Sequence, residues 1–305
     1  MDDFIVTPSR LGSDTDLSQG IIQLLRSGGR DPSCLDPSHP SFSSSEQYEI
    51  LSARYKNQLI ADGLESGHFV FDPDKGINIA IAQPLPSIAG YIFEAFTVRK
   101  INENKEAIGK QAFLWATERR RVKSVYLEQF HAGGVGHLSV QSCFPQLYNP
   151  TLRQFDVVFY RMNQARNEPE PAVVKGTTNS AGIQIKAITG NEESAIIRPL
   201  RERKYRRVLT YLRHPNGKHS YEVCMSLIKN LQREGKIDQE ESQALEEAIA
   251  SPEQISINQR EVDEYYAYIR AWSERKAEQD ATIFSAVGLQ MTENKHGHSL
   301  ITTLT

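Results

Sequence analysis

Cysteines and long hydrophobic runs are scarce in this chain, and each shortage excludes a class of protein. Among the 305 residues there are only three cysteines, which lie far apart at positions 34, 143 and 224. This odd, scattered set indicates neither a disulfide framework nor a zinc module. No apolar run approaches the roughly 18 residues that cross a bilayer, and the acidic start of the chain is unlike a signal peptide. We therefore expect a cytoplasmic protein with no membrane partner.

A strong charge of one sign is also lacking. The formal net charge is −3, which argues against a surface coated by nucleic acid. The glycine-rich segment 131–137 is not followed by Gly-Lys-Ser/Thr, so a flexible loop is a better interpretation than a nucleoside triphosphate site. The composition, 39% hydrophobic and 24% charged, is that of a globular protein with enough chain for a sizeable core.

Hydrophobic periodicity and turn residues divide the chain into three parts. Residues 1–85 are loop-rich, with a short helix expected near 17–26. A second helix is expected at 46–61, capped by serines and ended by Gly63 and Gly67. Two short strands are expected at 69–71 and 77–81. Residues 86–215 begin with two predicted helices, at 88–102, capped by Ser87, and at 104–123. Four predicted strands follow, at 138–144, 155–160, 183–189 and 207–212. A polar connection at 163–180 joins the second and third of these strands. Residues 216–305 are a helical C-terminal region whose last 25 residues form a strand and a loose tail. Three apolar stripes in this region must be buried, so we expect it to cover the core or to form a contact in a homo-oligomer or with a partner subunit.

One strand carries the most informative pattern. Residues 183–188 read Ile-Gln-Ile-Lys-Ala-Ile, so Gln184 and Lys186 project from one face and apolar side chains from the other. Asp156 lies in the middle of the strand before it. Glu94 lies on a helix that is apolar on nearly every side, where a carboxylate is costly unless it is paired or bound to a cation. Gly90, one turn earlier on the same face, would let a strand or a phosphate approach closely.

These four polar side chains suit the hydrolysis of a phosphodiester, which needs an activated water and compensation of negative charge. Mg²⁺, or Mn²⁺, provides both and prefers oxygen ligands. Asp156 is the expected central ligand, with the Gln184 amide oxygen and the Ile185 carbonyl beside it and Glu94 completing the set. Lys186, about 7 Å along the strand from Gln184, would orient the attacking water or stabilise the developing charge.

The order of these residues resembles the PD-(D/E)xK nuclease superfamily. The Gln in place of the first acid of the dyad, with an upstream Gly-x-x-x-Glu helix, is similar to the branch of Mrr-type restriction enzymes and Holliday-junction resolvases. The resemblance covers roughly residues 86–212 and implies a restriction-endonuclease-like α/β fold, with a mixed central sheet flanked by helices and a C-terminal helical extension. It implies catalytic roles for Glu94, Asp156, Gln184 and Lys186, metal ligation by the first three, and a place in bacterial defence or restriction. Two features depart from the pattern: the long gap between Asp156 and Gln184, and Phe155 where the family has proline.

Two basic clusters are the candidate DNA contacts, because local positive charge near a site favours phosphate binding. The expected contacts are Arg119, Arg120, Arg121, Arg201, Arg203 and Lys204. We therefore predict a Mg²⁺-dependent DNA endonuclease, with RNA as another possible substrate. Two other interpretations stay open: an edge strand with solvated Gln184 and Lys186, and a catalytically inactive nuclease-fold subunit that binds nucleic acid or a partner protein.

Overall fold

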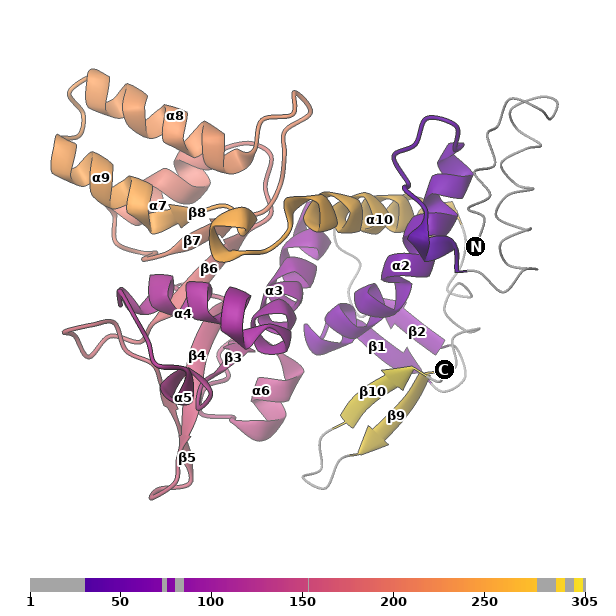
Figure 1. The fold of residues 1–305 in the computed structure, drawn as a ribbon, viewed down its shortest axis with the longest axis horizontal. Helices are drawn as coiled ribbons and strands as arrows, with labels where there is room; N and C mark the ends of the chain where they lie inside the picture. The colour runs from indigo at the N-terminus through magenta and orange to yellow at the C-terminus, as the bar shows by residue number, and fades with distance from the viewer. Residues whose placement is uncertain are drawn as a thin grey trace, which may run out of the picture.

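An open, mixed β-sheet lies between two layers of helices (Figure 1). The structure is a computed structural model and describes residues 31–72, 76–79, 85–152, 154–278, 289–293 and 299–303. The helix expected near residues 17–26 lies outside the described residues. The arrangement confirms the expected mixed α/β class, while the restriction-endonuclease-like architecture and the C-terminal extension stay predictions.

The described residues form a sheet of six strands in the order β3-β4-β6-β7-β8, with β5 paired to β4 at the side. The strands are β3 His131–Gly134, β4 Val157–Asn163, β5 Glu168–Pro171, β6 Gly182–Lys186, β7 Val208–Thr210 and β8 Ile249–Ala250. Strands β3, β4 and β6 are antiparallel neighbours, whereas β6, β7 and β8 run parallel. Strand β6 is therefore central, with a partner on each side.

Side chains of β6 alternate between the two faces of the sheet, as the sequence predicts. Ile183 and Ile185 belong to the larger hydrophobic core. Gln184 is paired in register with Val208, which belongs to the smaller core on the opposite face. Lys186, two residues further along, shares the face of Gln184. The predicted separation of polar and apolar side chains on this strand is confirmed.

The larger core lies between the sheet and four helices: α2 Ser44–Glu65, α3 Leu85–Glu103, α4 Lys110–Thr117 and α10 Gln259–Glu278. Helix α10 packs along α2 and α3 (Figure 1). Of its predicted apolar stripe, Val262, Tyr265 and Ile269 are fully enclosed and Tyr266 is partly buried, and Trp272 on the same helix is also enclosed. Large aromatic side chains bury the most apolar area per residue, so they contribute much of the stability of this layer.

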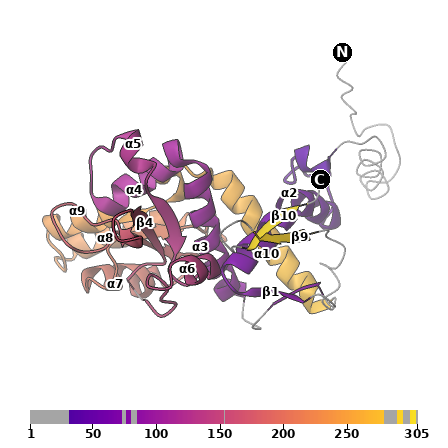
Figure 2. The ribbon, with the colours of Figure 1, turned by 90° about the horizontal axis from the view of Figure 1, so that it is seen from below.

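The opposite face of the sheet is covered by a π-helical turn and three helices: η4 Glu193–Ile197, α7 Arg198–Arg201, α8 Ser220–Arg233 and α9 Gln239–Ala248. Figure 2 shows β4 between α4 on one side and α7 on the other. Strand β8 follows α9 directly and pairs with β7. The chain after residue 216 thus contributes a strand to the sheet itself, while the proposed three-part division stays a prediction.

Short elements complete the described chain. They are η2 Pro32–Cys34, β1 Phe69–Asp72, β2 Gly76–Ile79, η3 Lys105–Gly109, α5 Ser124–Leu127, α6 Leu138–Cys143, η5 Pro252–Ile255, β9 Leu289–Glu293 and β10 Ser299–Thr303. The expected strands near 69–71 and 77–81 are confirmed as the antiparallel pair β1 and β2. Strands β9 and β10 form a second antiparallel pair.

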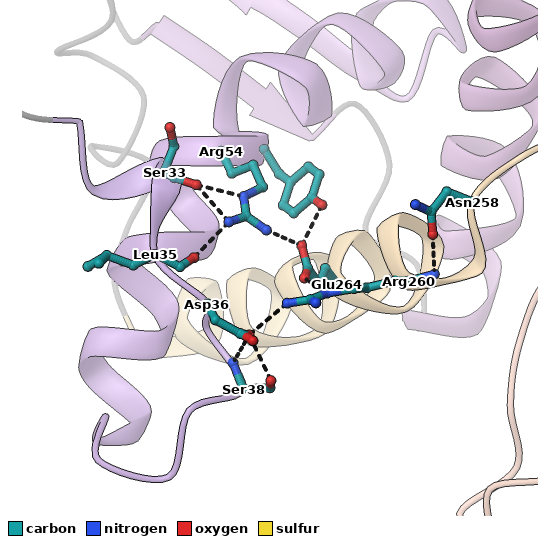
Figure 3. Close-up of polar contacts among 9 residues, drawn as sticks. Ser33, Leu35, Asp36, Ser38, Arg54, Asn258, Arg260 and Glu264 are labelled. Carbon is teal, nitrogen blue, oxygen red and sulfur yellow. Dashed lines mark hydrogen bonds and ion pairs between the residues drawn. The ribbon is translucent and has the colours of Figure 1, made fainter. Parts of the chain in front are cut away.

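Polar side chains hold α2 against α10 and the segment before α2. The Arg54 guanidinium donates to the backbone oxygens of Ser33 and Leu35 and to the Glu264 carboxylate (Figure 3). Arg260 joins Glu264 to Asp36. These contacts fix the entry into α2, whose N-terminus has the expected serine cap.

Several predicted boundaries are wrong at the N-terminal side of the core. Helix α3 begins at Leu85, so Ser87 lies within its first turn and is not its cap; Pro86 is accommodated because the first turn needs no N–H partner. The helix predicted at 104–123 is interrupted. Its last part, α4, ends at Thr117 because Glu118 adopts a left-handed conformation with φ 55°, and the arginines at 119–121 follow in a loop. Helix α2 runs past Gly63 to Glu65.

The segment around the glycines was also predicted incorrectly. Residues 131–134 form strand β3, not a loop, and Gly133 lets the Tyr160 ring and Val140 lie close against the strand. Residues 138–143 form helix α6, not a strand, because so short a segment fits either hydrophobic period. The connection at 163–180 contains β5, which forms a hairpin with β4.

Candidate active site

Asp156 lies immediately before β4, not in the middle of the strand as predicted. Its backbone nevertheless continues the ladder, because its N–H donates to the Ile183 carbonyl at 2.9 Å and its carbonyl accepts from Val135 N–H at 2.9 Å. The antiparallel register pairs Val157 with Ile183. Asp156 is therefore held rigidly opposite Gln184, at the end of the sheet where β4 begins and β6 ends.

The Asp156 carboxylate is bound directly to β6. Its Oδ2 atom accepts from Gln184 Nε2 at 2.5 Å and from the backbone N–H of Ile185 at 2.7 Å. Gln184 is only 6% exposed and β6 has neighbours on both sides, so the interpretation of a solvated edge strand is wrong. Two side chains 28 residues apart in sequence are thus joined, as the nuclease interpretation requires.

Phe155, which occupies the place of the family's proline, has a packing role. Its ring lies directly on Gly182, the residue before Ile183, and a Cβ atom at Gly182 would overlap the ring. A glycine is therefore required at the start of β6. This contact fixes the backbone on the N-terminal side of Asp156, where a proline would otherwise restrict it.

Glu94 and Lys186 lie close enough to Asp156 for their charges to interact. Burial raises the pKa of the Glu94 carboxyl well above its ordinary value, the negative charge of Asp156 raises it further, and the Lys186 ammonium opposes both effects. Burial also raises the pKa of Asp156, against the opposing influence of the Ile185 N–H and the Lys186 ammonium. Two neighbouring carboxyl groups of raised pKa are a common mark of a functional site.

Lys186 is oriented by an aromatic ring. Its Nζ atom lies 4.9 Å from the centre of the Tyr205 ring, which follows α7 in the chain. Such a cation–π contact holds an ammonium group without neutralising it. Lys186 therefore remains a hydrogen-bond donor beside the two carboxyl groups.

The oxygen atoms at this site fit a hard divalent cation. Gln184 Oε1 is buried and has no hydrogen-bond partner among the described residues, which is unusual for a buried amide oxygen. Among the described residues, no group of three or more His, Cys, Asp and Glu side chains has the arrangement of a metal site. The set here has only two carboxylates and an amide oxygen, so a cation bound to it would retain several waters, as Mg²⁺ usually does.

His137 is a neighbour that the sequence did not single out. It is 1% exposed, and its positive charge, when present, lowers the pKa of Asp156. The available signal is Gly134, three residues earlier, because the His137 ring lies directly on it. At Gly90 the structure leaves space, because no atom of the described residues lies within 4 Å of the position that a Cβ atom would occupy.

Glu118, which directly precedes Arg119, brings the two predicted basic clusters together by binding two arginines that closely follow Lys204. Its carboxylate pairs with Arg206 at 2.9 Å and with Arg207 at 3.1 Å. The next three residues in the chain are Arg119, Arg120 and Arg121, of which the last two are exposed. Two segments more than 80 residues apart in sequence thus form one surface.

Some of the predicted DNA contacts are already paired. Arg201 binds Glu241 at 2.8 Å, and Lys204 binds Glu202 at 2.7 Å. Arg201 and Arg203 line one wall of a groove of about 700 Å³, and acidic residues of α9 line the other. Tyr205, which contacts Lys186, also lines this groove. Tyr205 thus links this groove, which carries charges of both signs, to Lys186 of the candidate site.

Comparison with known proteins found no matching family model, no matching curated protein and no matching solved structure. Among the helices that the structure describes, none is long and apolar enough to cross a membrane.

Proposed function

We propose that this chain is a divalent-cation-dependent endonuclease that hydrolyses phosphodiester bonds of DNA. One observation carries the proposal: the Asp156 carboxylate, hydrogen-bonded to Gln184, shares the end of the sheet with a second carboxyl of raised pKa and with a lysine. A structural role alone gives no reason to gather these groups, because neighbouring buried carboxylates repel each other. A cation between them removes that cost.

Glu94, Asp156 and the Gln184 amide oxygen would hold the Mg²⁺ or Mn²⁺ ion. When bound, such an ion stabilises charge on a phosphate and lowers the pKa of a water. The Asp156 carboxylate is oriented by the two hydrogen bonds from β6, so it needs little reorganisation to bind. The Lys186 ammonium, held over Tyr205, is free to donate to the attacking water or to a phosphate oxygen.

The substrate path proposed here follows the basic surface and the groove. The exposed Arg120 and Arg121 would contact the phosphate backbone, and the open space at Gly90 leaves room for a phosphate beside Glu94. The resemblance to PD-(D/E)xK nucleases supports the proposed nuclease function, since the core of those enzymes is also a mixed sheet flanked by helices. The paired Arg201 and Lys204 would have to exchange their present partners for phosphates.

The test is cleavage of supercoiled plasmid by the purified chain in Mg²⁺, beside Asp156→Asn and Lys186→Ala. We expect wild-type cleavage that falls by roughly 10²–10³-fold in each variant. Lys218→Ala is the matched control, because Lys218 is an exposed lysine in a loop, and it should cleave as the wild type does. The same assay on labelled RNA decides between the two substrates.

Cleavage that survives both substitutions would place the activity elsewhere. A wild-type chain that binds duplex DNA and does not cut it would instead support the alternative of an inactive nuclease-fold subunit.

A further inference from the structure

His137 is a buried histidine that has no hydrogen-bond partner among the residues described by the structure. It is 1% exposed, and neither ring nitrogen has a partner within the described part of the chain. The nearest charged group is the Glu65 carboxylate, whose Oε1 atom lies 3.6 Å from Nδ1 and accepts a hydrogen bond from Ser139. At 3.6 Å the contact with His137 is an ion pair only when the ring is protonated.

Another buried histidine shows how such a ring is normally satisfied. His219 is 4% exposed, its Nδ1 accepts from Tyr221 N–H at 3.0 Å, and its Nε2 lies 3.2 Å from the Tyr211 carbonyl. Both of its nitrogens are used to cap α8 and to bind the adjacent strand. Because buried polar atoms in proteins are almost always hydrogen-bonded, the two unpartnered nitrogens of His137 call for a ligand or a bridging group.

The backbone places His137 beside the candidate site. The His137 N–H donates to the Gly134 carbonyl at 3.0 Å, which turns the chain back on β3 and lays the ring on Gly134. Gly134 is paired with Val157, and the next residue, Val135, donates to the Asp156 carbonyl. The ring therefore lies over Gly134, whose partner Val157 begins β4 and directly follows Asp156.

We propose that His137 is a positioning residue whose imidazole orients the Asp156 carboxylate through a bridging water. The inference deepens the proposed function and rests on it, since a fixed Asp156 would serve cation binding. The electrostatic influence of His137 on the pKa of Asp156 agrees with this placement. Hydrogen-bonding partners of metal-ligating groups typically change metal affinity 10–100-fold.

The first test measures Mn²⁺ affinity by electron paramagnetic resonance, together with thermal unfolding. His137→Leu fills a similar volume without a hydrogen bond, and we expect it to weaken Mn²⁺ binding by about 10–100-fold without lowering the unfolding midpoint. His137→Gln keeps an N–H donor and should retain more of the affinity. His39→Gln, at an exposed histidine, is the matched control and should bind as the wild type does. Unchanged Mn²⁺ affinity in His137→Leu would overturn the proposal.

The second test does not depend on a cation. In protein labelled with ¹⁵N-histidine, Asp156→Asn should shift the ring nitrogen resonances of His137 and leave those of His219 in place. Ring resonances of His137 that do not move would overturn the inference even if the wild type cleaves DNA. If the wild type neither binds Mn²⁺ nor cleaves, the proposed function fails, and the resonances still decide whether His137 and Asp156 interact.

Discussion

Replacing Glu94 with glutamine should stabilise the cation-free protein, which is the opposite of the usual effect of a mutation on a half-buried side chain. Glutamine keeps the shape of the side chain and removes its charge. In the folded protein that charge is disfavoured by burial and by the charge of Asp156, and only Lys186 opposes these effects. Most substitutions destabilise, so the expected sign is itself informative.

The magnitude follows from the neighbouring charges. A like-charge pair near a protein surface interacts by about 1–4 kcal/mol. The attraction of Lys186 cancels part of this repulsion, and the partial exposure of Glu94 screens the remainder. We expect Glu94→Gln to raise the free energy of unfolding by about 1 kcal/mol at neutral pH, or the unfolding midpoint by about 2 °C for a chain of this size.

The gain should depend on pH. Because the pKa of Glu94 is raised in the folded state, the folded wild type holds a proton that the unfolded chain releases, and wild-type stability falls as pH rises between the two pKa values. Well below pH 4.5, the ordinary pKa of this group, the carboxyl is protonated in both states and the variant has no advantage. The advantage should grow as pH rises above that value and then level off.

Urea unfolding at several pH values, with and without Mg²⁺, measures these differences. Glu103→Gln is the matched control on the same helix, because its side chain is 57% exposed and pairs with Arg99; it should change stability little. Saturating Mg²⁺ should stabilise the wild type by about 2.7 kcal/mol at 100 times the dissociation constant, and Glu94→Gln by less. A variant that is less stable than the wild type at neutral pH would show that Glu94 has a structural partner and would refute this reasoning.

Three further predictions concern the surroundings of the site. Arg99→Met should lower the free energy of unfolding by about 3 kcal/mol, measured in urea, because it leaves the buried Asp62 carboxylate without the guanidinium that binds both its oxygens. Gly90→Ala should raise the unfolding midpoint, since the added methyl meets no atom of the described residues and alanine favours a helix by about 1 kcal/mol. An increased KM in the plasmid assay would show that substrate occupies this space, and an unchanged KM would exclude it. Gly182→Ala should destabilise by about 1–3 kcal/mol through overlap with Phe155, and unchanged thermal unfolding would contradict that packing.

Strand β6 was predictable because its side chains obey a single period over its whole length. Each polar residue falls on one face and each isoleucine on the other, and no helical pattern fits. Glu94 could be singled out for a related reason, as a charge inside an apolar helix. In both cases a polar or charged side chain interrupts an otherwise apolar segment that is predicted to be buried. Polar residues at such positions tend to mark functional sites.

The errors arose where the decisive contact is distant in sequence. Helix α4 ends at Glu118, which adopts a left-handed conformation and binds Arg206 and Arg207 through its carboxylate. The sequence around Glu118 does not predict this pairing, because both arginines are distant in sequence. The glycines of β3 suggested a loop, whereas they are needed because the Tyr160 and His137 rings lie on them. Local propensity cannot distinguish a glycine chosen for its backbone freedom from one chosen for close packing.

The position of the site follows from the same packing. A carboxylate in the interior of a central strand would be surrounded by apolar neighbours, whereas Asp156 precedes β4 and its carboxylate binds the polar Gln184 of β6. There it keeps two backbone ladder bonds that fix its position and retains partial contact with solvent, through which a hydrated cation and a phosphate can approach. The end of the sheet thus holds Asp156 as rigidly as a strand residue while leaving it partly accessible, and the charges of Glu94 and Lys186 act on it there.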